Sequence, residues 1–338
     1  MFCFTDQLIH LLQERGHQGA VASALDAGDG VALRSRIMMK LGRRRFAKDK
    51  FRGYPVYRSW FPDQVIDQVA RDFKADVVVV QNHKTVPITQ RLQSDGFPTV
   101  LYFRNVEMEE LYGDINQLAS QPAFIANSQF TASAYRKAFG IECVIIPPLV
   151  SRAKYQTEST RENVTFINPV PKKGVDIAID IASACPDIPF VFVEGWKVES
   201  EEGRQLRAKL GALKNVTLHP RTDDMRSVYA KAKIVLAPSI WEEAWGRVAT
   251  EAQISGIPVI GSTRGGLPEA IGAGGVPIDI ESDRQVWVAE VRRLWDNAEE
   301  YARAVNAAKA YSLRDEINPT VQIDRFIEVL ETARAQRV

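Results

Sequence analysis

Short apolar runs rich in branched side chains recur through the first half of the chain, and helix-like segments separate them. These runs lie at 76–80, 99–103, 123–126 and 144–146. Continuous apolar runs of this length are typical of parallel strands that are buried on both faces of a sheet. Because the strands alternate with helices, the pattern predicts a doubly wound, Rossmann-like α/β domain over residues 1–150.

The beginning of this domain departs from that pattern. The first element that the sequence predicts is a helix over 4–15, with no strand before it. A doubly wound domain normally opens with a strand and a tight turn. The sequence therefore predicts that the first strand of the domain is missing and that the N-terminus is truncated.

The second half of the chain repeats the rhythm of strand and helix. Its apolar runs lie at 164–167, 190–193, 216–218, 234–236, 258–260 and 276–278. They predict a second doubly wound, Rossmann-like domain over residues 160–318, so the expected fold class is α/β. The polar stretch 151–163 predicts a linker, and the amphipathic pattern of 319–338 predicts a C-terminal helix.

Composition and charge narrow the class of protein. The 338 residues exceed what one hydrophobic core usually supports, which agrees with two domains. A formal net charge of +1 gives no overall field that would attract nucleic acid. The three cysteines are far apart, so neither a disulfide framework nor a zinc site is expected. No apolar run approaches the roughly 20 residues that cross a bilayer, and a cytoplasmic location is expected.

The candidate chemistry lies between residues 233 and 271, where two consecutive predicted strands end in glycine-containing loops that lead into helices. Gly246 precedes one helix, and its small size would leave the backbone N–H groups of Arg247 and Val248 open to a ligand. Gly265 and Gly266 stand in the adjacent loop. Helix N-termini at the carboxyl edge of a parallel sheet favour anions, so these loops predict a diphosphate site.

Charged side chains surround the same loops. Glu243 precedes the helix and Glu251 lies within it, with seven residues between them. Carboxylates accept hydrogen bonds well from the hydroxyl groups of a ribose or a hexose. Lys173 follows the strand predicted at 164–167 and is the candidate cation for the diphosphate. Together these residues indicate a sugar-nucleotide site.

An ordered set of motifs carries a family resemblance. The motifs are Lys173-Gly174, Pro238-Ser239, Glu243-x-x-Gly246-x4-Glu251-Ala252, Gly256-x-Pro258-Val259 and Gly265-Gly266-Leu267-x-Glu269. In this order they resemble the donor domain of glycosyltransferase family 4, whose members are retaining enzymes of GT-B fold. The resemblance implies a GT-B architecture, in which two Rossmann-like doubly wound domains face a central cleft.

The resemblance also implies roles for single residues. Glu243 would contact the donor sugar and Lys173 would neutralise the diphosphate, and these two are the candidate catalytic residues. Glu251 would hold the ribose, and Arg221 follows the strand at 216–218 near the expected base. The donor would be a UDP-sugar or a GDP-sugar. No cofactor is expected, and no metal either, because the chain contains no Asp-x-Asp pair.

Two positions depart from the family. The arginine that the family usually places five residues before the lysine is Asn168 here, so Arg264 or Arg247 is expected to supply the second positive charge. The acceptor-side histidine of the family corresponds to Arg104. His83, Arg104 and Asn105 are the acceptor-side candidates, and the resemblance implies a glycan or a lipid-linked acceptor.

Residues 34–52 form a basic segment that lies outside the predicted donor site. It holds nine basic residues against one acidic residue, with apolar side chains between them. Such a segment is typical of a surface that lies on an anionic membrane or binds a phosphorylated, lipid-linked acceptor. A solvated basic helix or loop is the alternative. The first interpretation places the protein at the inner face of the membrane as a peripheral protein.

Three functions follow from these patterns. The first is a retaining, metal-independent hexosyltransferase of polysaccharide biosynthesis that uses a nucleotide-sugar donor. The second is a catalytically inactive sugar-nucleotide-binding or scaffold protein, which Asn168 and Arg104 favour. The third is a dehydrogenase of related fold, which the sequence disfavours because no Gly-x-Gly-x-x-Gly follows a predicted strand.

Overall fold

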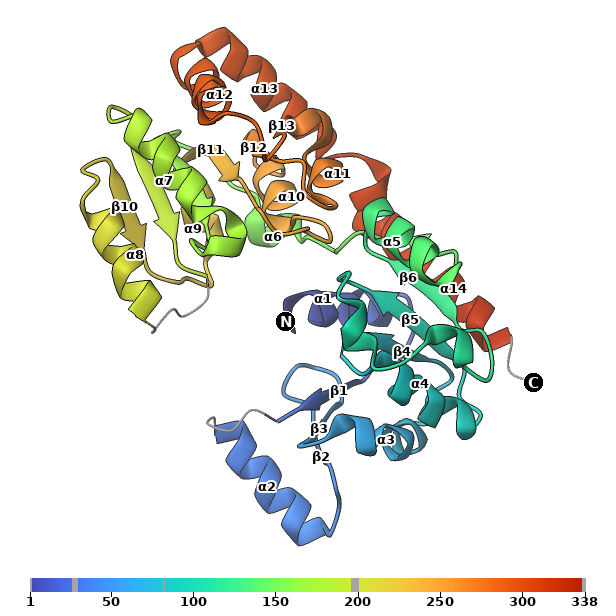
Figure 1. Ribbon diagram of the computed structural model, residues 1–338. Helices are drawn as coiled ribbons and strands as arrows, with labels where there is room; N and C mark the ends of the chain where they lie inside the picture. The colour runs from blue at the N-terminus through green and yellow to red at the C-terminus, as the bar shows by residue number, and fades with distance from the viewer. Residues whose placement is uncertain (1, 26–29, 82, 196–200, 336–338) are drawn as a thin grey trace. The chain divides into compact units, whose positions relative to one another are not determined.

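The chain forms two compact units, seen in a computed structural model that describes residues 2–25, 30–81, 83–195 and 201–335 (Figure 1). The first unit comprises residues 1–127, 131–149 and 320–338. The second unit comprises residues 128–130 and 150–319. Within the described ranges, no helix has both the length and the apolar character needed to cross a bilayer.

The first unit opens with the helix predicted there and a small sheet that the sequence did not predict. Its elements are α1 (Phe2–Glu14), β1 (Val21–Ala24), α2 (Gly30–Gly42), β2 (Ala47–Asp49) and β3 (Val56–Ser59). The strands lie in the order β1-β3-β2, with β1 parallel and β2 antiparallel to β3. These strands are short and carry charged residues, including the Arg58–Asp49 ion pair at 2.6 Å, so they lack a continuous apolar run.

The rest of the first unit is a parallel sheet in the order β4-β5-β6-β7. Strands β5 and β6 coincide with the apolar runs at 99–103 and 123–126. The unit thus divides its strands between two sheets. That a strand is missing before α1 stays a prediction. The elements of this part are β4 (Val78–Gln81), β5 (Thr99–Phe103), β6 (Ala123–Ala126), β7 (Val144–Ile145), α3 (Ile66–Phe73), α4 (Thr85–Ser94), α5 (Gln129–Phe139) and the short 3-10 helices η1 (Pro62–Gln64), η2 (Met108–Leu111) and η3 (Ile115–Gln117).

The second unit is one six-stranded parallel sheet with helices on both faces. Its strands are β8 (Asn163–Ile167), β9 (Phe190–Val193), β10 (Val216–His219), β11 (Ala232–Ala237), β12 (Val259–Ser262) and β13 (Gly275–Ile278). Its helices are α6 (Arg152–Tyr155), α7 (Val175–Ala184), α8 (Glu201–Gly211), α9 (Met225–Tyr229), α10 (Arg247–Gln253), α11 (Leu267–Ile271), α12 (Arg284–Asp296) and α13 (Ala298–Tyr311), with 3-10 helices η4 (Pro171–Lys173), η5 (Gly272–Gly274) and η6 (Asp315–Ile317).

The strand order of this sheet is β10-β9-β8-β11-β12-β13. In chain order, the first strand of the unit therefore lies beside the fourth, as in a Rossmann sheet, and the direction of winding reverses between β8 and β11. Side chains of alternating strand positions fill both faces, with Phe166 and Leu236 on one side and Val235 and Val259 on the other. Burial on both faces explains the continuous apolar runs in the sequence.

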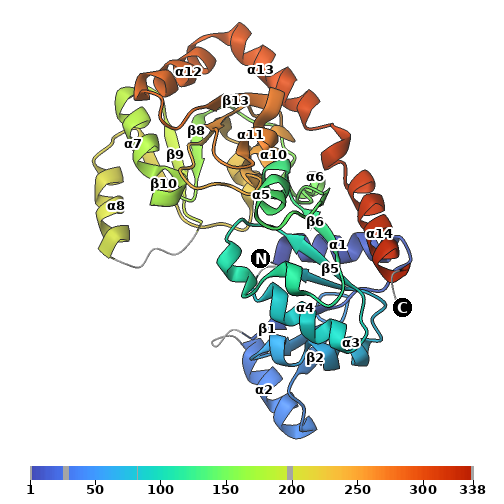
Figure 2. The same ribbon diagram turned by 45° about the vertical axis from the view of Figure 1, so that its right-hand side comes forward.

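The C-terminal helix α14 (Pro319–Ala335) belongs to the first unit, although it follows the second in the chain. Ile323, Phe326 and Val329 enter the same core as Phe4 and Tyr102. The Phe326 and Tyr102 rings lie 6.3 Å apart between centroids. Figure 2 shows α14 beside α1 and β5. Of the helix predicted at 319–338, the described part is thus an integral part of the first unit's core, and residues 336–338 lie outside the described residues.

Candidate functional site

The candidate site lies where the winding of the six-stranded sheet reverses. Ligands of open α/β sheets bind at the carboxyl ends of the strands at this point. The loop after β8 forms η4, which ends at Lys173, and Gly174 follows with a φ of +77°. A Cβ atom on Gly174 would lie 1.9 Å from the backbone oxygen of Pro238 in the loop after β11. Only glycine allows these two loops to meet.

Lys173 and Glu243 form an ion pair across the two loops. The Ser239 hydroxyl donates to Oε1 of the same carboxylate at 3.0 Å. The backbone N–H groups of Ile240 and Trp241 both donate to the carbonyl of Lys172, at 3.1 and 3.0 Å, and hold the loops together. The side chains of Lys173 and Glu243 remain 24% and 17% exposed, so a ligand can reach both.

A third loop, after β12, closes onto Glu243. The backbones of Glu243 and Gly265 form a parallel bridge, and the N–H of Gly266 donates to the carbonyl of Glu243 at 2.5 Å. A Cβ atom on Gly265, which has a φ of +63°, would lie 2.3 Å from that carbonyl oxygen. Gly246, with a φ of +94°, comes directly before α10. The four predicted residues Lys173, Glu243, Gly265 and Gly266 are therefore brought together, and Gly246 caps the N-terminus of the adjoining helix.

Glu251 occupies a different environment from Glu243. Its carboxylate is buried, accepts a hydrogen bond from the Tyr229 hydroxyl at 3.0 Å and pairs with the Arg247 guanidinium at 3.1 Å. Arg247 also donates to the Tyr155 hydroxyl at 3.3 Å. Burial raises the pKa of Glu251 against the opposing effect of Arg247. The sequence did not indicate Tyr155 or Tyr229, because neither belongs to a local motif.

The candidates for a second positive charge differ in their surroundings. Arg247 is turned toward Glu251 and Tyr155. Arg264 forms a 3.6 Å ion pair with the exposed Glu281. Its Nε is buried and has no hydrogen-bond partner among the described atoms. Val248, beside Arg247 at the start of α10, is partly buried and packs against the core.

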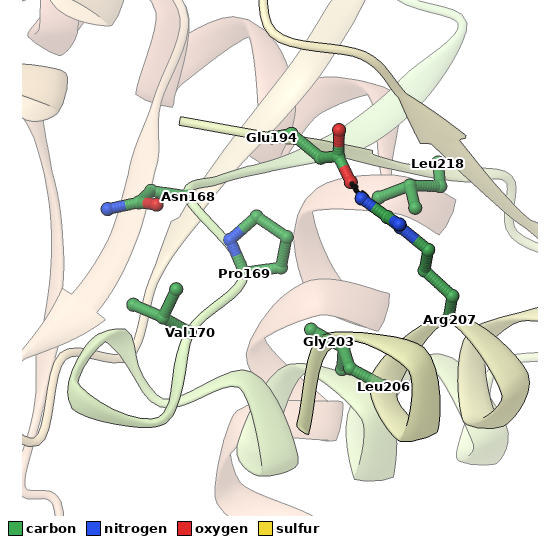
Figure 3. A pocket seen from close by; sticks show the side chains of 8 residues that line it. All are labelled: Asn168, Pro169, Val170, Glu194, Gly203, Leu206, Arg207 and Leu218. Carbon is green, nitrogen blue, oxygen red and sulfur yellow. Dashed lines mark hydrogen bonds and ion pairs between the residues drawn. The ribbon is translucent and has the colours of Figure 1, made fainter. Parts of the chain in front are cut away.

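A small pocket adjoins the start of this site at the carboxyl ends of β8, β9 and β10 (Figure 3). Asn168 lies at its edge with a φ of +63°, and its side chain points away from the Glu194–Arg207 ion pair. A Cβ atom on Gly195 would lie 2.8 Å from the Asn168 side chain. Arg221, the predicted neighbour of a base, is exposed and does not line this pocket.

The acceptor-side candidates all lie in the first unit, after β4 and β5. Arg104 donates to the Gln81 side chain at 3.2 Å and stacks over the Phe4 ring, 4.4 Å from its centroid. Asn105 donates to Glu110 at 2.8 Å.

The third candidate of this group is a histidine in the loop after β4. His83 is exposed and meets the Tyr112 ring edge-on at 4.6 Å between centroids. Parallel strands end at one edge of a sheet, so these three side chains share the carboxyl edge of β4 and β5. An acceptor role for them stays a prediction.

Comparisons with known proteins agree with this geometry. Residues 151–311 match the family model of glycosyl transferases group 1. The D-inositol 3-phosphate glycosyltransferase of Segniliparus rotundus is 28% identical over 214 residues, which are 55% of this chain and 47% of that protein. The chain thus spans about half the length of this curated relative. The family match covers the whole segment from β8 to α13 that carries Lys173 and Glu243.

Solved structures resemble the chain along nearly its whole length. A glycosyltransferase of Rickettsia africae superposes with a TM-score of 0.77 at 13% identity, covering 98% of this chain and 94% of that one. HepE of Anabaena, solved with UDP-glucose, gives a TM-score of 0.76 at 18% identity, covering 96% and 95%. At such identities the likeness is one of fold. The fold is GT-B, with two Rossmann-like α/β parts, as the sequence predicted.

Proposed function

We propose that this chain is a retaining glycosyltransferase that moves a sugar from a nucleoside diphosphate sugar to a glycan or a lipid-linked acceptor. The observation that carries the proposal is the meeting of Lys173 and Glu243 at the point where the sheet reverses its winding. A lysine beside a carboxylate suits a donor that combines a diphosphate with a hydroxyl-rich sugar. The match of residues 151–311 to group 1 glycosyl transferases supports the same function.

Lys173 binds the diphosphate in this proposal. An ammonium group has three N–H donors, so Lys173 can contact phosphate oxygens while it still holds Glu243. Glu243 in turn accepts hydrogen bonds from the hydroxyl groups of the donor sugar, and Ser239 keeps its carboxylate in place. Gly246, Gly265 and Gly266 let the backbone approach the same ligand closely.

Transfer then proceeds with retention of configuration. The acceptor hydroxyl oxygen attacks the anomeric carbon from the face on which the diphosphate leaves. The bond between that carbon and the phosphate oxygen breaks, and the hydroxyl proton passes to the leaving phosphate. Lys173 stabilises the negative charge that develops on the leaving group, which is the largest contribution that such a site makes.

Arg264 is the better candidate for the second positive charge that Asn168 does not supply. Arg247 is committed to the buried carboxylate of Glu251, whereas Arg264 has a long ion pair with an exposed partner. With Lys173 and Arg264 on the diphosphate, transfer is expected to proceed without a divalent metal. Both UDP-sugars and GDP-sugars suit this charge pattern.

A second function belongs beside the first. A protein that binds a sugar nucleotide without transferring the sugar would keep Lys173 for the diphosphate but would not need the residues that serve transfer. Asn168 and Arg104 favour this alternative, because each replaces a residue that the resembling family uses. Binding and transfer must therefore be measured separately.

The test is calorimetric titration of the full chain with UDP, GDP and ADP, followed by an assay of sugar release or transfer from the matching donors. Lys173→Ala is expected to weaken diphosphate binding at least about tenfold, because it removes a charged hydrogen bond. Glu243→Gln is expected to keep or strengthen that binding, since Lys173 loses a competing carboxylate, while transfer falls. Lys172→Ala is the control, because its ammonium group lies over the Trp241 ring instead.

The outcomes separate the hypotheses. Binding that depends on Lys173, together with transfer that depends on Glu243, supports the enzyme. Binding that depends on Lys173 without any release or transfer of sugar supports the inactive binding protein. If no nucleoside diphosphate binds, or if Lys172→Ala and Lys173→Ala behave alike, both proposals are wrong.

A further inference from the structure

We propose that helix α2 docks the first unit on an anionic lipid bilayer by inserting its outer face among the lipid headgroups. The proposal rests on this helix alone and does not depend on the proposed transfer reaction. Leu33, Ile37 and Leu41 stand at intervals of four residues, so they form one stripe along the helix. Their side chains are 62%, 52% and 81% exposed. An apolar stripe of this kind at the surface indicates a binding face.

The buried face of α2 is made of small residues, so the core of the unit does not use the larger apolar side chains of the stripe. The residues of α2 that are buried are the small Ala32 and Ser35. The helix packs on β2 with this small-residue face, while the side chains of Leu33, Ile37 and Leu41 remain exposed. A helix that served only the core of the unit would bury its leucine and isoleucine side chains.

Basic residues border the stripe on both sides. At about 100° per residue, Arg36 and Lys40 lie along one edge of the stripe and Arg34 lies along the other. Arg34 extends over the ring of Phe51, 4.8 Å from its centroid, and Phe51 is itself 61% exposed. The apolar surface thus continues past the helix. An apolar centre between cationic edges is typical of a helix that lies in the headgroup layer of a membrane.

The charge of the surrounding segment favours an anionic partner. Residues 34–52 hold nine basic residues and one acidic residue, in a chain whose formal net charge is +1. Arg44 and Lys48 pair with Asp72. Among the described residues, by contrast, Lys40, Arg43 and Lys50 have no acidic partner, and all three are exposed.

A lipid bilayer fits these observations better than another partner. A second copy of the chain, packed face to face, would bring the arginine-lined edges of two α2 helices together and create like-charge repulsion. A nucleic acid would satisfy the charges but would leave the leucine and isoleucine side chains in water. Anionic headgroups above a hydrocarbon layer satisfy both requirements, since each basic residue near such a surface adds attraction.

The test is co-sedimentation of the full chain with vesicles of phosphatidylcholine alone and of phosphatidylcholine with phosphatidylglycerol in equal parts. Binding is expected to the mixed vesicles only and to weaken as salt is added. A triple variant, Leu33→Ser with Ile37→Ser and Leu41→Ser, is expected to lower the bound fraction at least about tenfold, because the apolar insertion is lost. Arg36→Glu with Lys40→Glu is expected to do the same.

Val286→Ser with Leu313→Ser is the matched control, because these exposed apolar residues lie in the second unit. This control is expected to bind like the wild type. Circular dichroism establishes that each variant is folded, which is expected because the changed side chains are exposed. Equal binding to both kinds of vesicle, or unchanged binding by the triple variant, would overturn the proposal. So would light scattering that shows a dimer dissociated by the triple variant, with no vesicle binding by either form.

Discussion

Glu243 and Glu251 are of the same residue type and stand near each other in the chain, yet their surroundings separate their chemistry. Glu243 lies in a loop, pairs with Lys173 and remains partly exposed. Glu251 lies one helix further on, buried between Tyr229 and Arg247. A residue of the first kind can bind a ligand directly. A residue of the second kind must first give up the partners that the fold provides.

The burial of Glu251 leads to a prediction about pH. Its pKa is raised above the ordinary value of 4.5, so the folded protein holds the proton more tightly than the unfolded chain does. The contribution of Glu251 to the free energy of unfolding is therefore complete below that ordinary value and is lost as the pH rises through the folded pKa. Glu251→Gln, which cannot ionise, is expected to gain stability relative to the wild type as the pH rises above about 4.5.

Urea unfolding of both proteins across this range measures the difference. Since Tyr229→Phe removes the hydrogen-bond donor of this carboxylate and leaves the carboxylate itself, it serves as the companion variant. A difference between the wild type and Glu251→Gln that stays constant with pH would contradict the prediction.

At the scale of elements, three loops build the site, and glycines decide how closely they approach. The loops follow β8, β11 and β12, which are consecutive neighbours in the sheet. Gly174 sits against the loop after β11, and Gly265 sits against Glu243 in the same loop. Each has a positive φ, so both positions require glycine for two reasons: the backbone conformation disfavours other residues, and no space is left for a side chain.

Gly174 and Gly140 provide a test of this packing, because they share a backbone conformation and differ in surroundings. Their φ values are +77° and +70°, and a Cβ atom on Gly140 would meet no atom within 4 Å. Gly140→Ala is expected to cost about 1 kcal/mol for the left-handed conformation. Gly174→Ala is expected to cost a further ~1–3 kcal/mol, because the new methyl group must displace the Pro238 backbone.

Chemical denaturation gives the free energy of unfolding for each variant. Equal losses for the two alanine variants would show that the loops after β8 and β11 yield to the methyl group. In that case the close contact of these loops would not be what positions Lys173.

At the scale of the whole molecule, the order of elements along the chain differs from their grouping in space. The chain completes the first unit only after it has built the second, because α14 returns to the core of α1 and β5. Gln322 on this helix donates to the carbonyl of Pro147 at 2.7 Å, inside the same unit. Helix α14 therefore stabilises the first unit.

Phe326→Ala tests this grouping. The side chain is 1% exposed, and its removal is expected to destabilise the first unit by about 3–5 kcal/mol. Hydrogen exchange is expected to quicken in β4, β5 and α1, whereas the strands β8 to β13 keep their protection. Val321→Ala is the control on the same helix, because Val321 is 38% exposed and its loss should change stability by less than about 0.5 kcal/mol. Faster exchange confined to the second unit would contradict the assignment of α14.

The sequence by itself determined the strands that lie inside parallel sheets, such as β5, β6 and β9, because burial on both faces requires a continuous apolar run. It also indicated the glycine-containing loops and the candidate pair Lys173 and Glu243, since these signals are local. Only the tertiary structure decided what lies far apart in the chain. It formed the mixed strands β1 to β3, placed Tyr229 on Glu251, and joined α14 to the first unit. These features depend on contacts between segments that are distant in the chain, and a local sequence pattern does not indicate which distant segment it will contact.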